Sequence, residues 1–115
     1  MKMDRVRIER LLNRLTIEYL DQPGEVSRWK DKISGDLVGN EKNHGLWFLL
    51  GSIYYIEGDF ERAADCFTNC INLDASNVQY HKNLAFALRQ MGRYGEFEDI
   101  IFDKLPNLKN SAKDI

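Results

Sequence analysis

The 115-residue sequence contains only two cysteines and two histidines, and this scarcity argues against several kinds of small protein. Two cysteines are too few for a disulfide scaffold, and together with two histidines they do not suggest a structural zinc framework. No stretch approaches the ~18 consecutive apolar residues of a transmembrane helix, so no membrane span is predicted. The opening residues MKMDRVRIER lack the apolar core and cleavage site of a secretory signal, which predicts a cytoplasmic protein.

Positive charge is not in excess, because 16 Lys+Arg against 18 Asp+Glu leave a net charge of −2. Non-specific binding of nucleic acid requires a concentrated basic surface, so we expect no nucleic-acid partner. Apolar residues make up 43% of the sequence and charged residues 30%, a balance typical of a folded domain rather than a disordered chain. The length suffices for one hydrophobic core.

The signatures of common enzymes are also absent: there is no phosphate loop, glycine-rich nucleotide turn or nucleophile elbow. The acidic residues Glu96, Glu98 and Asp99 could perform acid–base chemistry only in a cleft, and we interpret them as the solvated face of a helix. Cys66 and Cys70 could bind a metal together with a histidine. We interpret them instead as small, buried helix residues with no disulfide between them. We therefore expect neither an enzyme nor a metal or other cofactor.

What the sequence does contain is an internal period of 34 residues, a length typical of repeat proteins built from stacked units. The positions that coincide are glycine or large and apolar: Gly24, Gly58 and Gly92; Val26, Phe60 and Tyr94; Leu20, Tyr54 and Leu88; and Ile33, Phe67 and Ile101. This period divides the chain into an N-terminal hairpin (1–43) that is either a degenerate repeat or a cap, two further units (44–77 and 78–111), and a polar tail (112–115).

Within each unit the apolar residues recur at i, i+3 or i+4, the spacing of an amphipathic helix. Turn and cap residues delimit these helices: Pro23-Gly24 predicts a turn, Asp59 and Asn77 are N-caps, and Pro106 ends the last helix. The predicted helices run over about 8–19, 26–37, 46–56, 60–73, 78–91 and 94–105. We therefore predict an all-α fold, a short α-solenoid of about six antiparallel helices in three helical hairpins.

The second unit resembles the tetratricopeptide repeat. The residues that carry the resemblance are Trp47, Leu50, Gly51 and Tyr54 on the first helix, followed by Gly58, Ala63, Ala64 and Phe67. In this interpretation the small side chains at positions 51 and 63 let the two helices cross closely. The third unit departs from the pattern, because His81 occupies the tryptophan position and Phe97 occupies the position of Ala63, which predicts a wider crossing. Ala75 replaces the family's usual proline.

The resemblance implies that the first helices line a concave groove that binds peptides or protein segments. By register, the groove residues are Phe48, Ser52, Tyr55, Gln79, Lys82, Phe86 and Arg89, with Arg14, Glu18 and Asp21 at one end. Aromatic side chains beside long cations suit an extended segment with apolar anchors and a carboxylate. The alternative is that Phe48 and Phe86 only pack between neighbouring helices and that Lys82 and Arg89 are only solvated.

One binding mode of the family is not expected. Co-chaperones with this repeat hold the C-terminal carboxylate of heat-shock chaperones with a set of Lys, Asn and Arg residues. The five corresponding positions here hold Arg14, Glu18, Leu49, Gln79 and Asn83. Only Arg14 keeps the required charge, and Glu18 would repel a carboxylate.

We therefore predict a protein–protein interaction module, an adaptor or scaffold, with two alternatives. The first is a self-assembling homo-oligomer that uses the apolar residues of the last helix: Phe97, Ile100, Ile101 and Leu105. The second is a small dedicated chaperone. The N-terminal stretch with Arg7, Arg10 and Arg14 could lie on an anionic membrane surface, but its apolar stripe is also what a packing helix needs.

Overall fold

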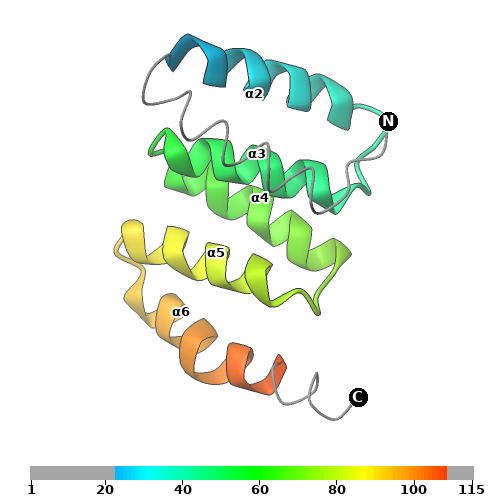
Figure 1. Cartoon of the computed structure of the whole chain (residues 1–115). Coiled ribbons are helices and arrows are strands. Elements are labelled where there is room, and N and C mark those ends of the chain that lie inside the picture. The colour runs from blue at the N-terminus through cyan, green and yellow to red at the C-terminus, as the bar shows by residue number, and fades with distance from the viewer. Residues whose placement is uncertain (1–22, 109–115) are drawn as a thin grey trace.

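The computed structural model describes residues 23–108, and these residues form a stack of helices without a strand (Figure 1). The elements are α2 (Pro23–Leu37), α3 (His44–Ile56), α4 (Phe60–Leu73), α5 (Val78–Gln90), α6 (Tyr94–Asp99) and the π-helical turn η1 (Ile100–Lys104), after which an α-helix resumes over 105–108. Each helix packs on the next one along the chain. The predicted all-α solenoid class is confirmed. The helix predicted over 8–19, and with it Arg7, Arg10, Arg14, Glu18 and Asp21, lies outside the described residues.

Short loops join the helices, and side-chain caps begin three of them. Asn43, Asp59 and Asn77 each accept a hydrogen bond from a backbone N–H in the first turn of the following helix, at 3.2, 3.2 and 2.9 Å. Gly58 and Gly92 have φ values of +82° and +77°, a conformation that glycine adopts at low cost. The predicted N-caps Asp59 and Asn77 and the glycine turns between helices are therefore confirmed.

The start of α2 corrects one element of the sequence prediction. Pro23 and Gly24 form the first turn of this helix rather than a turn before it. Proline is well suited to a first helical position, because its missing N–H would have no partner there and its φ is already helical. The alignment of Gly24 with Gly58 and Gly92 is therefore wrong as a structural equivalence, since the latter two lie in loops.

The crossing of α3 and α4 depends on small residues. A Cβ atom at Gly51 would lie 2.8 Å from Cε1 of Phe67 and 2.9 Å from Cβ of Cys66, so no side chain fits there without displacement. Ala63 is fully buried, and Phe67 exposes only 1% of its surface. The interpretation of Gly51 and Ala63 as residues of a close helix crossing is confirmed, and Phe67 fills the centre of that crossing.

α3 and α5 each make an equivalent hydrogen bond to the loop before them, with a different donor in each helix. Trp47 Nε1–H donates to the backbone carbonyl of Glu41, and His81 Nε2–H donates to the carbonyl of Ala75, both at 2.8 Å. In each case the acceptor lies six residues before the donor. A carbonyl can only accept, so this contact places a proton on Nε2 of His81. His81 of α5 thus makes the same kind of hydrogen bond to the preceding loop that Trp47 of α3 makes.

The last helix does not end at Pro106. The N–H of Leu105 donates to the carbonyl of Ile100, five residues earlier, and the helix continues through residue 108. In an α-helix a proline ring clashes with the carbonyl four residues before it, and the wider π turn immediately before Pro106 relieves that contact. The same bond places Leu105 one turn beyond Ile100, and both side chains are buried, at 5% and 3% exposure.

Candidate functional site

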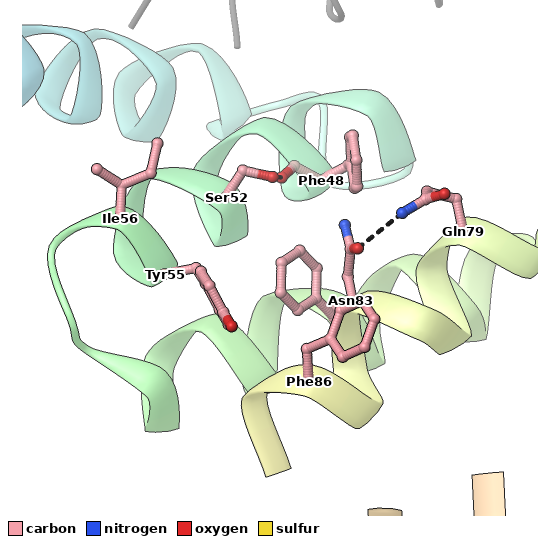
Figure 2. Close-up of a pocket in the computed structure, with 8 residues that line it drawn as sticks. Phe48, Ser52, Tyr55, Ile56, Gln79, Asn83 and Phe86 are labelled. Carbon is pink, nitrogen blue, oxygen red and sulfur yellow. Dashed lines mark hydrogen bonds between the residues drawn. The ribbon is translucent and has the colours of Figure 1, made fainter. Parts of the chain in front are cut away.

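A pocket of about 330 Å³ opens between α3 and α5, with α4 as its floor (Figure 2). Its eight lining residues are Phe48, Ser52, Tyr55 and Ile56 from α3, Phe67 from α4, and Gln79, Asn83 and Phe86 from α5. The structure thus brings together five of the seven residues predicted for the groove. We call this set of eight residues the α3–α5 groove.

Four of the eight lining side chains are aromatic, and they are anchored to different degrees. The ring centroid of Phe48 lies 6.1 Å from that of Phe67 and 5.3 Å from that of Tyr80, so Phe48 also packs α3 against α4 and α5. Phe86 keeps 40% of its surface exposed. Tyr55 packs edge-on against Phe60, with centroids 5.1 Å apart. Phe48 therefore combines a packing role with a place in the groove, whereas Phe86 offers free apolar surface.

The polar groups of the groove are the amides of Gln79 and Asn83 and the hydroxyls of Ser52 and Tyr55. Gln79 Nε2 donates to Asn83 Oδ1 at 2.8 Å, which orients the Asn83 amide (Figure 2). The Asn83 NH₂ group points across the groove toward α3. Ser52 Oγ donates to the Phe48 carbonyl at 2.8 Å and so offers its oxygen only as an acceptor. Among the aromatic rings, the groove therefore presents the Asn83 amide as an oriented donor and the Ser52 hydroxyl oxygen as an acceptor.

The predicted cations do not line this groove. Lys82 is half-buried outside it, and the guanidinium of Arg89 lies over the Phe97 ring, 6.0 Å from its centroid, toward α6. At ~100° per residue, positions 82 and 89 lie about 60–80° around α5 from the face that carries Gln79, Asn83 and Phe86. No lining residue is Asp, Glu, Lys, Arg or His, so the groove contains no charged side chain.

Three lining residues were missed by the sequence prediction: Ile56, Phe67 and Asn83. Asn83 follows Gln79 by four residues and Ile56 follows Ser52 by four. Helical neighbours at that spacing share a face, so extending each stripe by one turn would have found both. Phe67 lies on the floor, where its burial in the helix crossing concealed its second role.

The apolar residues predicted for self-assembly face the interior of the described chain. Ile100 and Leu105 are buried together with Ala85 and Leu88 of α5, and Phe97 and Ile101 pack half-buried against the same cluster. A contact between copies cannot use Ile100 and Leu105 without unpacking α6 and η1. The large apolar side chains that α6 and η1 expose are instead Tyr94 and Phe102, at 61% and 75%.

The two cysteines are buried free thiols, as interpreted from the sequence. Burial, followed by the charges of Asp65 and Asp59, raises the pKa of the Cys66 thiol to about 12. Burial also raises the pKa of Cys70, whose thiol lies 3.4 Å from the His44 carbonyl. Since the thiolate is the nucleophile and the metal ligand, both groups are chemically quiet at neutral pH. Among residues 23–108 no cluster of three His, Cys, Asp or Glu residues could hold a metal ion.

Thiol labelling tests this burial. At pH 8 we expect Cys66 and Cys70 to react with a thiol reagent only as fast as the protein unfolds, and to react at once in denaturant. Because both folded-state pKa values are raised, the thiols contribute stability that is complete below the unfolded-state pKa near 9 and declines as the pH rises toward 12.

A double Cys66→Ala, Cys70→Ala variant serves as the control for the pH dependence. It should lose less stability than the wild type between pH 9 and pH 10, as measured by urea unfolding. Rapid labelling of either thiol in the native protein would contradict the burial.

The tetratricopeptide repeat family model matches residues 44–77, which are α3, α4 and the turns that flank them. A TPR repeat-containing protein of Methanocaldococcus jannaschii is 28% identical over 65 residues, which are 56% of this chain and 12% of that protein. The chain thus spans only a small part of that relative's length. Within residues 23–108 no helix is both long enough and apolar enough to cross a membrane.

Proposed function

We propose, on the premise that residues 44–77 form a tetratricopeptide repeat, that this chain is a protein-interaction module that binds a segment of another protein in the α3–α5 groove. Such repeats generally mediate protein–protein interaction and are a non-catalytic fold. The observation that carries the proposal is the concave, uncharged pocket of about 330 Å³ with the half-exposed Phe86 in its wall. Pockets of this kind are the usual places where apolar anchors bind.

The lining chemistry defines the segment that fits. Phe48, Tyr55 and Phe86 favour one large apolar side chain as the anchor, seated over Phe67. The Asn83 amide is placed to donate to a backbone carbonyl of an extended segment, and the Ser52 hydroxyl oxygen to accept from a backbone N–H. Because the groove contains no cation, the proposal assigns it an uncharged anchor and no terminal carboxylate.

The proposal extends to the organisation of the chain. An adaptor or scaffold role in the cytoplasm, without a catalytic step, accords with the repeat. The division into an N-terminal hairpin (1–43), two repeat units (44–77 and 78–111) and a tail (112–115) remains part of this proposal. The α3–α5 groove lies between the first helices of the two repeat units.

Selection from a random peptide library tests the groove. The immobilised full chain is used to select displayed peptides, and the recovered peptides are measured by fluorescence anisotropy against two variants. Phe86→Ala removes the exposed anchor surface, and Asn83→Ala removes the amide donor. We expect Phe86→Ala to weaken binding about tenfold or more and Asn83→Ala by severalfold, since an anchor contact at an interface centre contributes about 1–2 kcal/mol or more.

Lys82→Ala is the matched control, because position 82 lies on the same helix but outside the groove. It should change the affinity by less than about twofold. Circular dichroism verifies that each variant is folded. Peptides that bind the wild type and Phe86→Ala equally well would contradict the assignment of the groove.

A further inference from the structure

The outer side of α6 and η1 carries two exposed aromatic side chains among carboxylates. Tyr94 and Phe102 lie two helical turns apart, and Glu98, Asp99 and Asp103 are exposed beside them. We call these five residues the terminal face. In Figure 1 they belong to the helix at the end of the stack opposite α2.

The folding of η1 explains why Phe102 is on the outside. Ile100 is buried against α5, and a residue two positions further along a helical turn lies roughly on the opposite side of it. Burial of Ile100 and Leu105 therefore directs Phe102 away from α5 and leaves 75% of its surface exposed. Large exposed apolar side chains rimmed by polar groups typically mark an interaction surface.

The charge around these aromatics is predominantly negative. Among residues 23–108 no ion pair involves Glu98 or Asp99, and Asp103 accepts a hydrogen bond of 3.4 Å from the side chain of Asn107. Next to Asp99, a second pocket of about 390 Å³ is also lined by Asp65 and Glu96, with Arg93 and Lys104 as its cations. Arg93 is already bound to Glu96, with Nη2 and Oε1 2.7 Å apart.

The environment of Arg93 reflects the same negative potential. Its hydrogen bond to Glu96 raises the pKa of the guanidinium, and the nearby carboxylates of Glu61 and Asp65 raise it further. The acidic character therefore extends from the terminal face to the neighbouring side of α4. A ligand for this surface must bring positive charge as well as apolar side chains.

We propose that the terminal face is a second docking surface, independent of the α3–α5 groove, and that it binds a basic amphipathic helix of a partner protein. The apolar stripe of that helix packs on Tyr94 and Phe102, and its lysines or arginines lie against Glu98, Asp99 and Asp103. Each described helix already packs on its neighbour in the stack, so a helix is the shape that continues this packing. Cations beside Tyr94 and Phe102 also gain from the faces of the rings.

Three synthetic peptides of about 18 residues, long enough to form an isolated helix, test the proposal by anisotropy with the full chain. The first has a leucine stripe and a lysine face. The second keeps the leucines and carries glutamates, and the third keeps the lysines and replaces the leucines with alanine. We expect binding of the first alone, weakened as salt is raised.

Variants of the chain locate the contact. Phe102→Ala should weaken binding of the leucine–lysine peptide about tenfold, and Asp99→Asn with Asp103→Asn should weaken it and reduce its salt dependence. Phe86→Ala, which affects the groove, should leave it unchanged. A failure of the groove proposal thus does not affect this result, and the converse also holds.

The other outcomes overturn the proposal. Equal binding of the glutamate peptide would show that charge complementarity does not determine the contact. Equal binding of the alanine peptide would show that apolar packing on Tyr94 and Phe102 does not determine it. If Phe102→Ala does not change the affinity for the leucine–lysine peptide, the peptide binds outside the terminal face. Sedimentation equilibrium of the chain alone covers the remaining case, because a dimer abolished by Phe102→Ala would show that a second copy occupies the terminal face.

Discussion

Replacement of Phe67 with alanine is expected to lower the free energy of unfolding by about 3–5 kcal/mol, the cost of removing a fully buried aromatic ring. The ring is 1% exposed and lies where α3 crosses α4, against Gly51 on one side and the rings of the groove on the other. On the α3 side, Gly51 has no side chain that could fill the space that the ring would leave. Urea unfolding followed by circular dichroism measures the loss.

Phe102→Ala is the matched control, since it deletes the same side chain from a position that is 75% exposed. Its free energy of unfolding should stay within about 0.5 kcal/mol of the wild type. A loss at Phe67 no larger than the loss at Phe102 would contradict the packing of the helix crossing. Phe67→Ala should also weaken peptide binding in the groove under conditions in which the variant is folded, because Phe67 forms its floor.

Gly51→Val is expected to cost about 3 kcal/mol or more, for the opposite reason. A Cβ atom alone would lie 2.8 Å from the ring of Phe67 and 2.9 Å from Cβ of Cys66, and valine adds two methyl groups in that space. Neither neighbour can move aside easily, because both are buried. Overpacking of this kind forces helices apart, and its cost exceeds the few tenths of a kcal/mol that valine gains over glycine in helix propensity.

Gly35→Val is the control for this substitution. Gly35 also lies within a helix, α2, but a Cβ atom there would meet nothing within 4 Å among the described residues. We expect a change of less than about 0.5 kcal/mol, in the stabilising direction. Thermal unfolding of the two variants side by side would reveal a crossing looser than described if Gly51→Val melted at the temperature of Gly35→Val.

Local signals in the sequence predicted most of the fold because they act within one or two turns. Asp59 and Asn77 cap the helices that follow them, and the glycines at 58 and 92 form the turns between helices. The errors arose where two local signals competed. Pro23 can open a helix as readily as it can precede one, and Pro106 is tolerated after a π turn that no sequence pattern announces.

The 34-residue period also predicted the wrong buried residue in the last helix. The 34-residue period aligns Ile101 with Phe67, yet the buried residue is Ile100 and Ile101 is half-buried. The wider π turn begins at this position and shifts the residues that face α5, a change that a fixed period cannot follow.

The structure places the predicted aromatic residues in the groove and the two predicted cations, Lys82 and Arg89, outside it. Helical spacing identifies the residues that share one face of a helix. On α3 and α5 it selected five residues that line the groove: Phe48, Ser52, Tyr55, Gln79 and Phe86. Lys82 and Arg89 lie near the edge of that face, where the way neighbouring helices pack decides which side a long side chain takes. The guanidinium of Arg89 lies over the ring of Phe97, a residue of α6. The spacing of residues within α5 carries no information about that contact.

The indole contact of Trp47 with the Glu41 carbonyl has a spectroscopic consequence. The sequence contains two tryptophans, and both lie near one end of the described stack, Trp29 in α2 and Trp47 in α3. In α5 the equivalent position is occupied by His81, which gives no tryptophan fluorescence. Tryptophan fluorescence, excited selectively where tyrosine does not absorb, therefore reports on α2 and α3 alone, while far-ultraviolet dichroism averages over every helix. In a stack of helices in which each helix contacts its neighbours, unfolding can begin at one end. Loss of the tryptophan signal before the dichroism signal would show that unfolding begins at α2 and α3, and the reverse order would show that it begins at α6.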